Sequence, residues 1–181
     1  YRSSRGLGDV YKRQGFKEYN HLKSKNYTNF AKEKIAVTGY HNYQLGISED
    51  SRNLYKSLKE ITTYVKASNI PLNSLNNKIE SNYKIYDFID SKHNFIVLPP
   101  LEQLNLFMKS PIYFNENKVY GLMPWELESI PKNFYCIFKK INVVLAPSNF
   151  LKQVFSEIHK DVRPVSYTHL TLPTSTNVLL S

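Results

Sequence analysis

The chain has 181 residues, of which 41% are hydrophobic and 22% charged, and its 24 Lys and Arg against 15 Asp and Glu give a formal net charge of +9. This composition excludes a disordered chain, and no run approaches the roughly 18 unbroken apolar residues that a membrane-spanning helix needs. The one cysteine, Cys136, excludes an internal disulfide and a metal site made of cysteines, which favours a reducing compartment such as the cytoplasm.

The two ends of the chain differ from its middle. Residues 4–14 read SRGLGDVYKRQ and residues 165–174 read VSYTHLTLPT, and both resemble translated sequencing adaptor. Sequence of that origin is excluded from fold reasoning, so we expect the chain to be a fragment without its natural termini. The expected division is adaptor-derived sequence at 1–14 and 165–181, a lead-in at 15–33, and one domain at 34–164.

The positive net charge of the chain is partly due to its first 14 residues. Residues 1–14 hold four cations and one anion and the tail holds neither, so the remaining segment has 20 cations against 14 anions, or +6. Its lysines are interspersed with glutamates and no aromatic RNA-binding signature occurs. We therefore expect lysines on a solvated surface and no nucleic-acid partner, with attraction for phosphates or an anionic membrane surface as the alternative.

The first part of the domain is typical of a strand followed by a helix. Residues 35–40 (IAVTGY) form a short apolar run that ends at glycine, which predicts a buried strand. After a polar loop, Ser48 has the chemistry of an N-cap residue. Apolar residues then recur at helical spacing, which predicts an amphipathic helix over residues 49–66.

The rest of the domain repeats this alternation. Apolar runs predict strands and 3.6-residue periodicity predicts helices. The expected strands are a short edge strand at 69–72, then 94–98, 118–122, 141–146 and one that begins at Val162; the expected helices begin at 101, 131 and 149.

Solid apolar strands that alternate with helices indicate an α/β domain with a doubly wound, mostly parallel sheet covered on both faces. In such sheets ligands bind beyond the carboxyl ends of the strands. Four segments therefore become candidates for a site: residues 41–48, 99–100, 123–128 and 147–148.

Gly46 and His41 lie in the first of these segments. A glycine before a helix N-terminus lets backbone amides approach a phosphate, although the turn alone would also explain it. His41 could polarise or deprotonate a hydroxyl, because the ordinary histidine pKa is close to neutrality, and a solvated loop histidine is the alternative. Arg52 has two interpretations as well, a phosphate contact or an i, i+3 pair with Glu49.

Trp125 and Glu126 form the most informative pair of side chains. The single Trp follows a predicted strand, directly before a glutamate. An indole face beside a carboxylate suits sugar recognition, because the ring covers C–H groups and the carboxylate accepts hydrogen bonds from hydroxyls. The alternative is a tryptophan that packs under the following helix.

Three segments carry a resemblance to a known family. GISEDSRNLYKSLKE at 46–60, YGLMPWELESIPKNF at 120–134 and INVVLAPSNFLKQVF at 141–155, in this order, resemble the N-terminal half of a retaining, family-4-type glycosyltransferase of the GT-B fold. The resemblance covers about residues 34–164, and the Trp-Glu-Leu-Glu block with the Ala-Pro-Ser-x-Phe turn is its specific part. Ser48 departs from the pattern, because the family often has a second glycine there.

The resemblance implies a Rossmann-like acceptor-side domain whose donor-binding partner domain, with a Glu-x7-Glu pair, is missing from the chain. It implies metal-independent transfer of a sugar from a nucleotide-sugar donor to a hydroxyl of a sugar or lipid-linked sugar, with no cofactor and with the fragment inactive alone. Peripheral contact with the inner face of a membrane is a further expectation. The implied residues are Gly46, Ile47 and Ser48 facing the donor diphosphate, Arg52 as a phosphate contact, and His41, Trp125, Glu126, Pro147 and Ser148 on the acceptor side. No catalytic residue is assigned.

Two other functions stay open. One is a different doubly wound nucleotide- or phosphate-binding enzyme, which is disfavoured because residues 15–164 contain neither G-x-G-x-x-G nor G-x-x-x-x-G-K-[ST]. The other is a non-catalytic interaction module, since a fold does not fix a function.

Overall fold

The protein is built around one parallel β-sheet. The computed structural model describes residues 35–72, 79, 81–115 and 118–165. Within these residues, seven strands form the sheet in the order β3-β2-β1-β4-β5-β6-β7, and every neighbouring pair is parallel. The strands are β1 (Ile35–Gly39), β2 (Val65–Asn69), β3 (Ile85–Tyr86), β4 (His93–Val97), β5 (Lys118–Leu122), β6 (Val143–Ala146) and β7 (Val162–Pro164).

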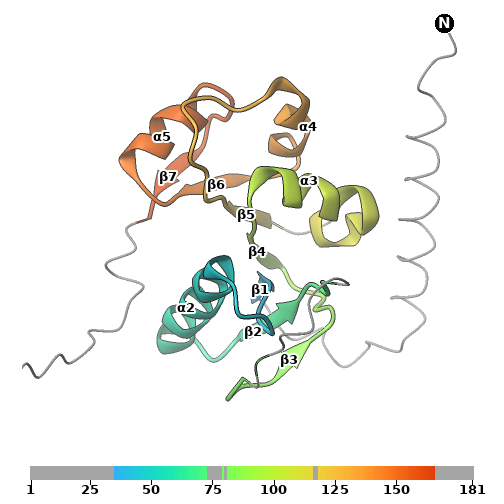
Figure 1. The fold of residues 1–181 in the computed structure, drawn as a ribbon. Helices are drawn as coiled ribbons and strands as arrows, with labels where there is room; N and C mark the ends of the chain where they lie inside the picture. The colour runs from blue at the N-terminus through green and yellow to red at the C-terminus, as the bar shows by residue number, and fades with distance from the viewer. Residues whose placement is uncertain (1–34, 73–78, 80, 116–117, 166–181) are drawn as a thin grey trace, which may run out of the picture.

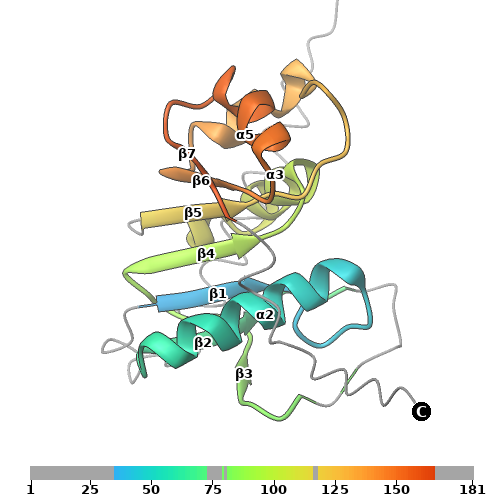
Figure 2. The same cartoon turned by 90° about the vertical axis from the view of Figure 1, so that its left-hand side faces the viewer.

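Helices cover both faces of the sheet, as a doubly wound fold requires. They are α2 (Gly46–Ile61), α3 (Pro100–Lys109), the 3₁₀ turns η2 (Pro111–Phe114) and η3 (Lys132–Phe134), α4 (Tyr135–Phe138) and α5 (Asn149–Ser156). Helix α2 lies across β1 and β2 on one face, and α3 lies on the other face (Figures 1 and 2). The expected α/β, doubly wound, Rossmann-like fold is therefore confirmed.

Alternate residues of the strands feed two apolar clusters. Val37 of β1 and Val97 of β4 pack with Leu54 of α2 in one cluster. Ile96 of β4 and Val144 of β6 pack in the other, together with residues of α3, α4 and α5. Because period-2 alternation sends neighbouring side chains to opposite faces, a solid apolar strand supplies both clusters at once.

Two boundaries in the first βαβ unit differ from the sequence-based expectation. Helix α2 begins at Gly46 with Leu45 as its N-cap residue, so the assignment of Ser48 as N-cap was wrong. The helix also ends at Ile61 instead of residue 66, because Val65 belongs to β2, where it pairs with Ile35. Val65 fits the helical spacing only by coincidence. The edge strand expected at 69–72 was wrong, because the strand in this region is β2, which lies earlier in the chain and ends at Asn69.

The later elements follow their predictions more closely. Strand β5 matches the expected residues 118–122, and β7 begins at Val162 as expected. The helix expected from residue 131 is divided into the turn η3 and the short α4. The predicted lead-in and nearly all of both predicted adaptor segments lie outside the described residues.

Gly121 of β5 provides a first test of this packing. A Cβ there would lie 3.1 Å from Ile141 Cδ1, 3.1 Å from Met123 Cε and 3.2 Å from Gln103 Oε1. These atoms are the ends of flexible side chains, so we expect Gly121→Ala to lower the free energy of unfolding by about 1 kcal/mol. Urea denaturation followed by circular dichroism would measure this, and a loss as large as that of a backbone clash would contradict the packing described.

Within the described ranges, no helix combines the length and apolar character needed to cross a membrane.

Candidate ligand-binding edge

The direction in which the chain adds successive strands to the sheet reverses between β1 and β4. From β1 the chain proceeds through β2 and β3 to one side, and from β4 through β5, β6 and β7 to the other. Ligands of doubly wound proteins bind at the carboxyl ends of the strands at such a switch point. Here that edge holds Tyr40 directly after β1, residues 46–48 at the start of α2, and Glu102 in the first turn of α3, which we call the switch-point edge.

The start of α2 is tightly seated on this edge. A Cβ on Gly39 would lie 2.2 Å from Ser51 Oγ and 3.3 Å from the carbonyl oxygen of Val97, so α2, β1 and β4 meet there. Ile47 packs against both apolar clusters. The helix N-terminus is thus held above the switch point itself.

The first turn of α2 leaves backbone donors free. Leu45 makes no side-chain capping bond, and in the described part of the chain no acceptor takes a hydrogen bond from the amides of Gly46 or Ile47. Gly46 is exposed, with nothing within 4 Å of an added Cβ. Ser48 is fully buried and its hydroxyl oxygen has no partner among the described residues. Free amides, open space and the positive end of the helix dipole together suit an anion.

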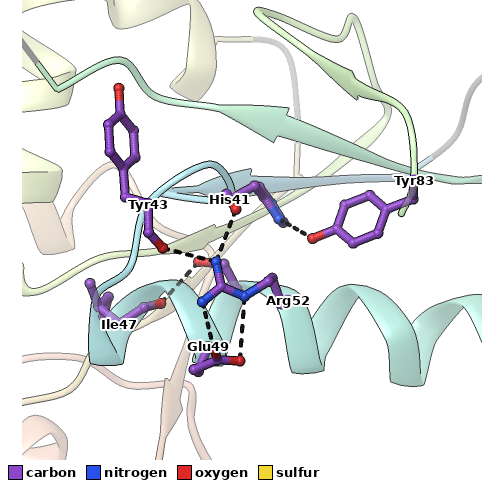
Figure 3. A network of polar contacts seen from close by, with 7 residues as sticks. His41, Tyr43, Ile47, Glu49, Arg52 and Tyr83 are labelled. Atoms are coloured by element: carbon purple, nitrogen blue, oxygen red, sulfur yellow. Dashed lines mark hydrogen bonds and ion pairs between the residues drawn. The ribbon is translucent and has the colours of Figure 1, made fainter. Parts of the chain in front are cut away.

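Arg52 fastens the loop that leads into α2. Its Nη1 donates to the carbonyl oxygens of His41 and Tyr43, both at 3.0 Å (Figure 3). Its Nε and Nη2 donate to the two carboxylate oxygens of Glu49 at 3.3 and 2.7 Å, and this pairing holds the pKa of Glu49 below its usual range. This geometry matches the interpretation of Arg52 as the i, i+3 partner of Glu49. To contact a phosphate, the guanidinium would have to break its hydrogen bonds with Glu49 or with one of the two carbonyl oxygens.

The side chain of His41 points into the protein. Its Nδ1 lies 3.0 Å from the Tyr83 hydroxyl (Figure 3). Its Nε2 lies 2.9 Å from the carbonyl oxygen of Val37. A carbonyl can only accept, so Nε2 carries the proton, and Nδ1 accepts from Tyr83, whose pKa burial raises to about 12. Burial lowers the pKa of His41 to about 4, against a smaller opposing effect of the Val37 carbonyl. In this arrangement both ring nitrogens are engaged internally.

Trp125 is half-buried in the loop after β5. Its indole N–H donates to the carbonyl oxygen of Ser129 at 3.1 Å, and its ring meets Phe134 edge-on with centroids 6.2 Å apart. The tryptophan therefore packs against the following turn, as its alternative interpretation stated, while Glu126 beside it is exposed.

The turn after β6 caps the helix that follows it, α5. The exposed Ser148 accepts a hydrogen bond from the Leu151 amide at 3.1 Å as the N-cap residue of α5. Pro147 precedes it and is half-buried. Both residues lie at the carboxyl edge, as predicted, but two strands away from the switch point.

The sequence did not single out Tyr40 and Glu102. Tyr40, directly after β1, lies close enough to Glu102 in the first turn of α3 for the carboxylate to affect its pKa. Burial and this carboxylate both raise the pKa of Tyr40. Glu102 follows Pro100 and so resembles an ordinary first-turn acid, and no local signal points to its pairing across the switch point.

The part of this edge that is open to a ligand is the start of α2, where free amides suit an anion. Tyr40 and the Oε2 atom of Glu102 are buried beside it. Among the described residues, no three His, Cys, Asp or Glu side chains gather where they could hold a metal ion.

Comparison with known proteins finds no protein-family model and no curated protein that matches this chain.

Proposed function

We propose that this chain is the acceptor-side half of a retaining, metal-independent glycosyltransferase of the GT-B fold. Such an enzyme would move a sugar from a nucleotide-sugar donor to a hydroxyl of a sugar or lipid-linked sugar. The observation that carries the proposal is the open N-terminus of α2 at the switch point, with exposed Gly46 and free amides where a diphosphate would lie. The three segments that resemble the family supply that helix start and two of the turns on the same edge.

In this proposal different residues of the carboxyl edge bind the donor and the acceptor. The amides of Gly46 and Ile47 bind the donor diphosphate from one side, and a second domain would hold the nucleotide and most of the sugar. Ser48 is fully buried below them, so its side chain supports the helix start and does not contact the phosphate. His41 takes a supporting role, because its ring holds the loop to β1 and to Tyr83. Trp125, Glu126, Pro147 and Ser148 would line the acceptor side, and a peripheral membrane location would suit a lipid-linked acceptor.

The rival dinucleotide-binding enzyme needs a tight glycine-rich turn between its first strand and helix. Here residues 40–45 separate β1 from α2, and Gly46 is the one glycine between Gly39 and the end of that helix. The loop is therefore wider than a dinucleotide turn, which supports the transferase over this rival.

Binding of nucleoside diphosphates tests the proposal on this chain. We expect UDP or GDP to bind in isothermal titration and NAD not to bind. Gly46→Val should weaken the binding by about tenfold, because a branched side chain fills the open space before the free amides. Its unfolding midpoint should stay near that of the wild type, since an added Cβ meets nothing there.

A matched control is Gly121→Ala, which adds a side chain away from α2. Tighter binding of NAD than of either diphosphate would favour the dinucleotide-binding rival. Binding of none of the three would contradict a diphosphate site at the start of α2. Equal diphosphate binding by the wild type and Gly46→Val would remove the role given to the start of α2.

A further inference from the structure

Lysines that are dispersed along the sequence gather at one edge of the sheet. A lysine is the first residue of β5, and a lysine lies within three residues before the start of β3, β4, β6 and β7. Because every neighbouring pair of strands is parallel, all these strand starts lie at the same edge, which we call the amino edge. It lies opposite the switch-point edge. Its six lysines, all exposed, are Lys84, Lys92, Lys118, Lys139, Lys140 and Lys160.

Backbone hydrogen bonds hold the strand starts side by side. The amide of Lys118 donates to the carbonyl oxygen of Lys92 at 3.0 Å. The amide of Val144 donates at 2.9 Å to the carbonyl oxygen of Asp161, which directly follows Lys160. Neighbouring strands lie about 4.8 Å apart, so the starts of β4, β5, β6 and β7 distribute cations along about 14 Å of the edge.

Few acids balance these lysines. Among the described residues, none of the six lysines forms an ion pair. The acids in the described segments that lead into β3 to β7 are Asp90, Glu157 and Asp161, and Asp161 is paired with Arg163 at 2.9 Å.

The carboxyl edge has the opposite charge. Its cations, in the segments that follow the strands, are Arg52 and Lys132. The acids of the same segments are Glu49, Asp50, Asp87, Glu102, Glu126 and Glu128. The positive charge of the domain is therefore concentrated at the amino edge.

An apolar side chain is exposed at the same edge. Ile61, the last residue of α2, is 80% exposed, and Tyr64 in the connection to β2 is 54% exposed. The amide of Ile35, which begins β1, donates to the carbonyl oxygen of Tyr64 at 3.2 Å, so this connection belongs to the amino edge. Cations beside an exposed apolar side chain are typical of proteins that lie on an anionic bilayer, where apolar side chains enter the headgroup region and tyrosine is also favoured.

These two features together select the partner. A nucleic acid would attract the lysines, but it gains little from an aliphatic side chain, because its bases stack on aromatic rings. We propose that the amino edge, through its six lysines and Ile61, docks the protein on an anionic phospholipid surface. A strand of five residues is about 16 Å long, so the switch-point edge then faces away from the bilayer. The inference requires no sugar transfer and does not rest on the proposed function.

Vesicle sedimentation of the whole 181-residue chain tests this docking surface. We expect the chain to sediment with phosphatidylcholine vesicles that contain about 30% phosphatidylserine, and not with phosphatidylcholine alone. Added salt should release it, because salt screens the lipid charges. The triple variant Lys92→Gln, Lys118→Gln, Lys160→Gln should bind the anionic vesicles at least about tenfold more weakly, since each lysine near such a surface contributes several-fold.

The matched control is the triple variant Lys56→Gln, Lys132→Gln, Lys152→Gln. It removes the same charge from three exposed lysines outside the amino edge, and it should bind like the wild type. Equal losses in the two triple variants would mean that net charge decides binding, which would overturn the inference. Absence of binding to the anionic vesicles would overturn it as well.

Ile61→Ser separates a lipid surface from a nucleic acid. It should weaken vesicle binding about fivefold, because a polar side chain does not enter the headgroup region. Vesicle binding equal to that of the wild type, or tighter binding of oligothymidylate than of vesicles at the same salt concentration, would overturn the choice of a lipid partner.

Two further measurements complete the test. Both triple variants change exposed residues, so their unfolding midpoints by circular dichroism should match the wild type. If the amino-edge variant fails to fold, the single variants Lys92→Gln and Lys160→Gln, each expected to weaken vesicle binding several-fold, test the same claim. Binding of UDP or GDP at Gly46 should be unchanged in the amino-edge variant, so failure of docking and failure of the proposed function are distinguishable.

Discussion

Gly39→Ala is expected to lower the free energy of unfolding by about 2–3 kcal/mol, as overpacking of a rigid contact does. The added methyl group would lie 2.2 Å from Ser51 Oγ and 3.0 Å from Ser51 Cβ. The carbonyl oxygen of Val97 in β4 is 3.3 Å from the same methyl group, so a backbone atom also limits how far β1 can move to relieve the clash. Urea denaturation measured by circular dichroism would report the loss.

Gly46→Ala is the matched control for this prediction. It makes the same chemical change at the other end of the loop, where an added Cβ meets nothing within 4 Å, and we expect no loss of stability. The double variant Gly39→Ala with Ser51→Ala should recover part of the loss, because it removes the closest atom but leaves Cβ in place. Equal stabilities of the two glycine variants would mean that α2 does not press on β1 as described.

Acid is expected to destabilise the protein through His41. The ordinary histidine pKa of 6.5 falls to about 4 in the folded protein, chiefly because the ring is buried. Above pH 6.5 both the folded and the unfolded chain hold the ring neutral. Between pH 6.5 and 4 the histidine of the unfolded chain binds a proton, whereas the buried ring of the folded protein stays neutral. The free energy of unfolding therefore falls by about 3 kcal/mol over this range.

His41→Gln should remove this pH dependence. The variant loses stability at neutral pH, because Tyr83 and the Val37 carbonyl lose a well-placed partner, but its further decline between pH 6.5 and 4 should be smaller by the same amount. Urea denaturation at a series of pH values measures both curves. Parallel curves for wild type and His41→Gln would show that the ring is protonated freely in the folded state.

Strand positions could be predicted from the sequence where the apolar run is isolated by polar residues or proline. Strand β5 was predicted to the residue for this reason, and β6 within two residues. The boundary between α2 and β2 could not be predicted, because Val65 fits a helical period and a strand equally well. Its pairing with Ile35 across the sheet decides the matter, and that contact is not visible in a local pattern.

The placement of four loop segments after the carboxyl ends of strands could be predicted, but the direction of their side chains could not. The parallel topology places all four predicted segments at carboxyl ends of strands. The direction in which a side chain points depends on partners far along the chain. His41 turns inward toward Tyr83, which is 42 residues away. Tyr40, which follows β1, likewise interacts with Glu102 of helix α3, 62 residues further along the chain.

A sugar-transfer assay on the complete gene product tests the central proposal most directly. A product of the same gene that carries the proposed donor-binding domain would be incubated with radiolabelled UDP- and GDP-sugars and a panel of glycoside acceptors. We expect the extended protein to transfer sugar with retained anomeric configuration without added metal, and the 181-residue chain alone to transfer none. Absence of transfer by the extended protein, or sustained turnover by the chain alone, would contradict the account.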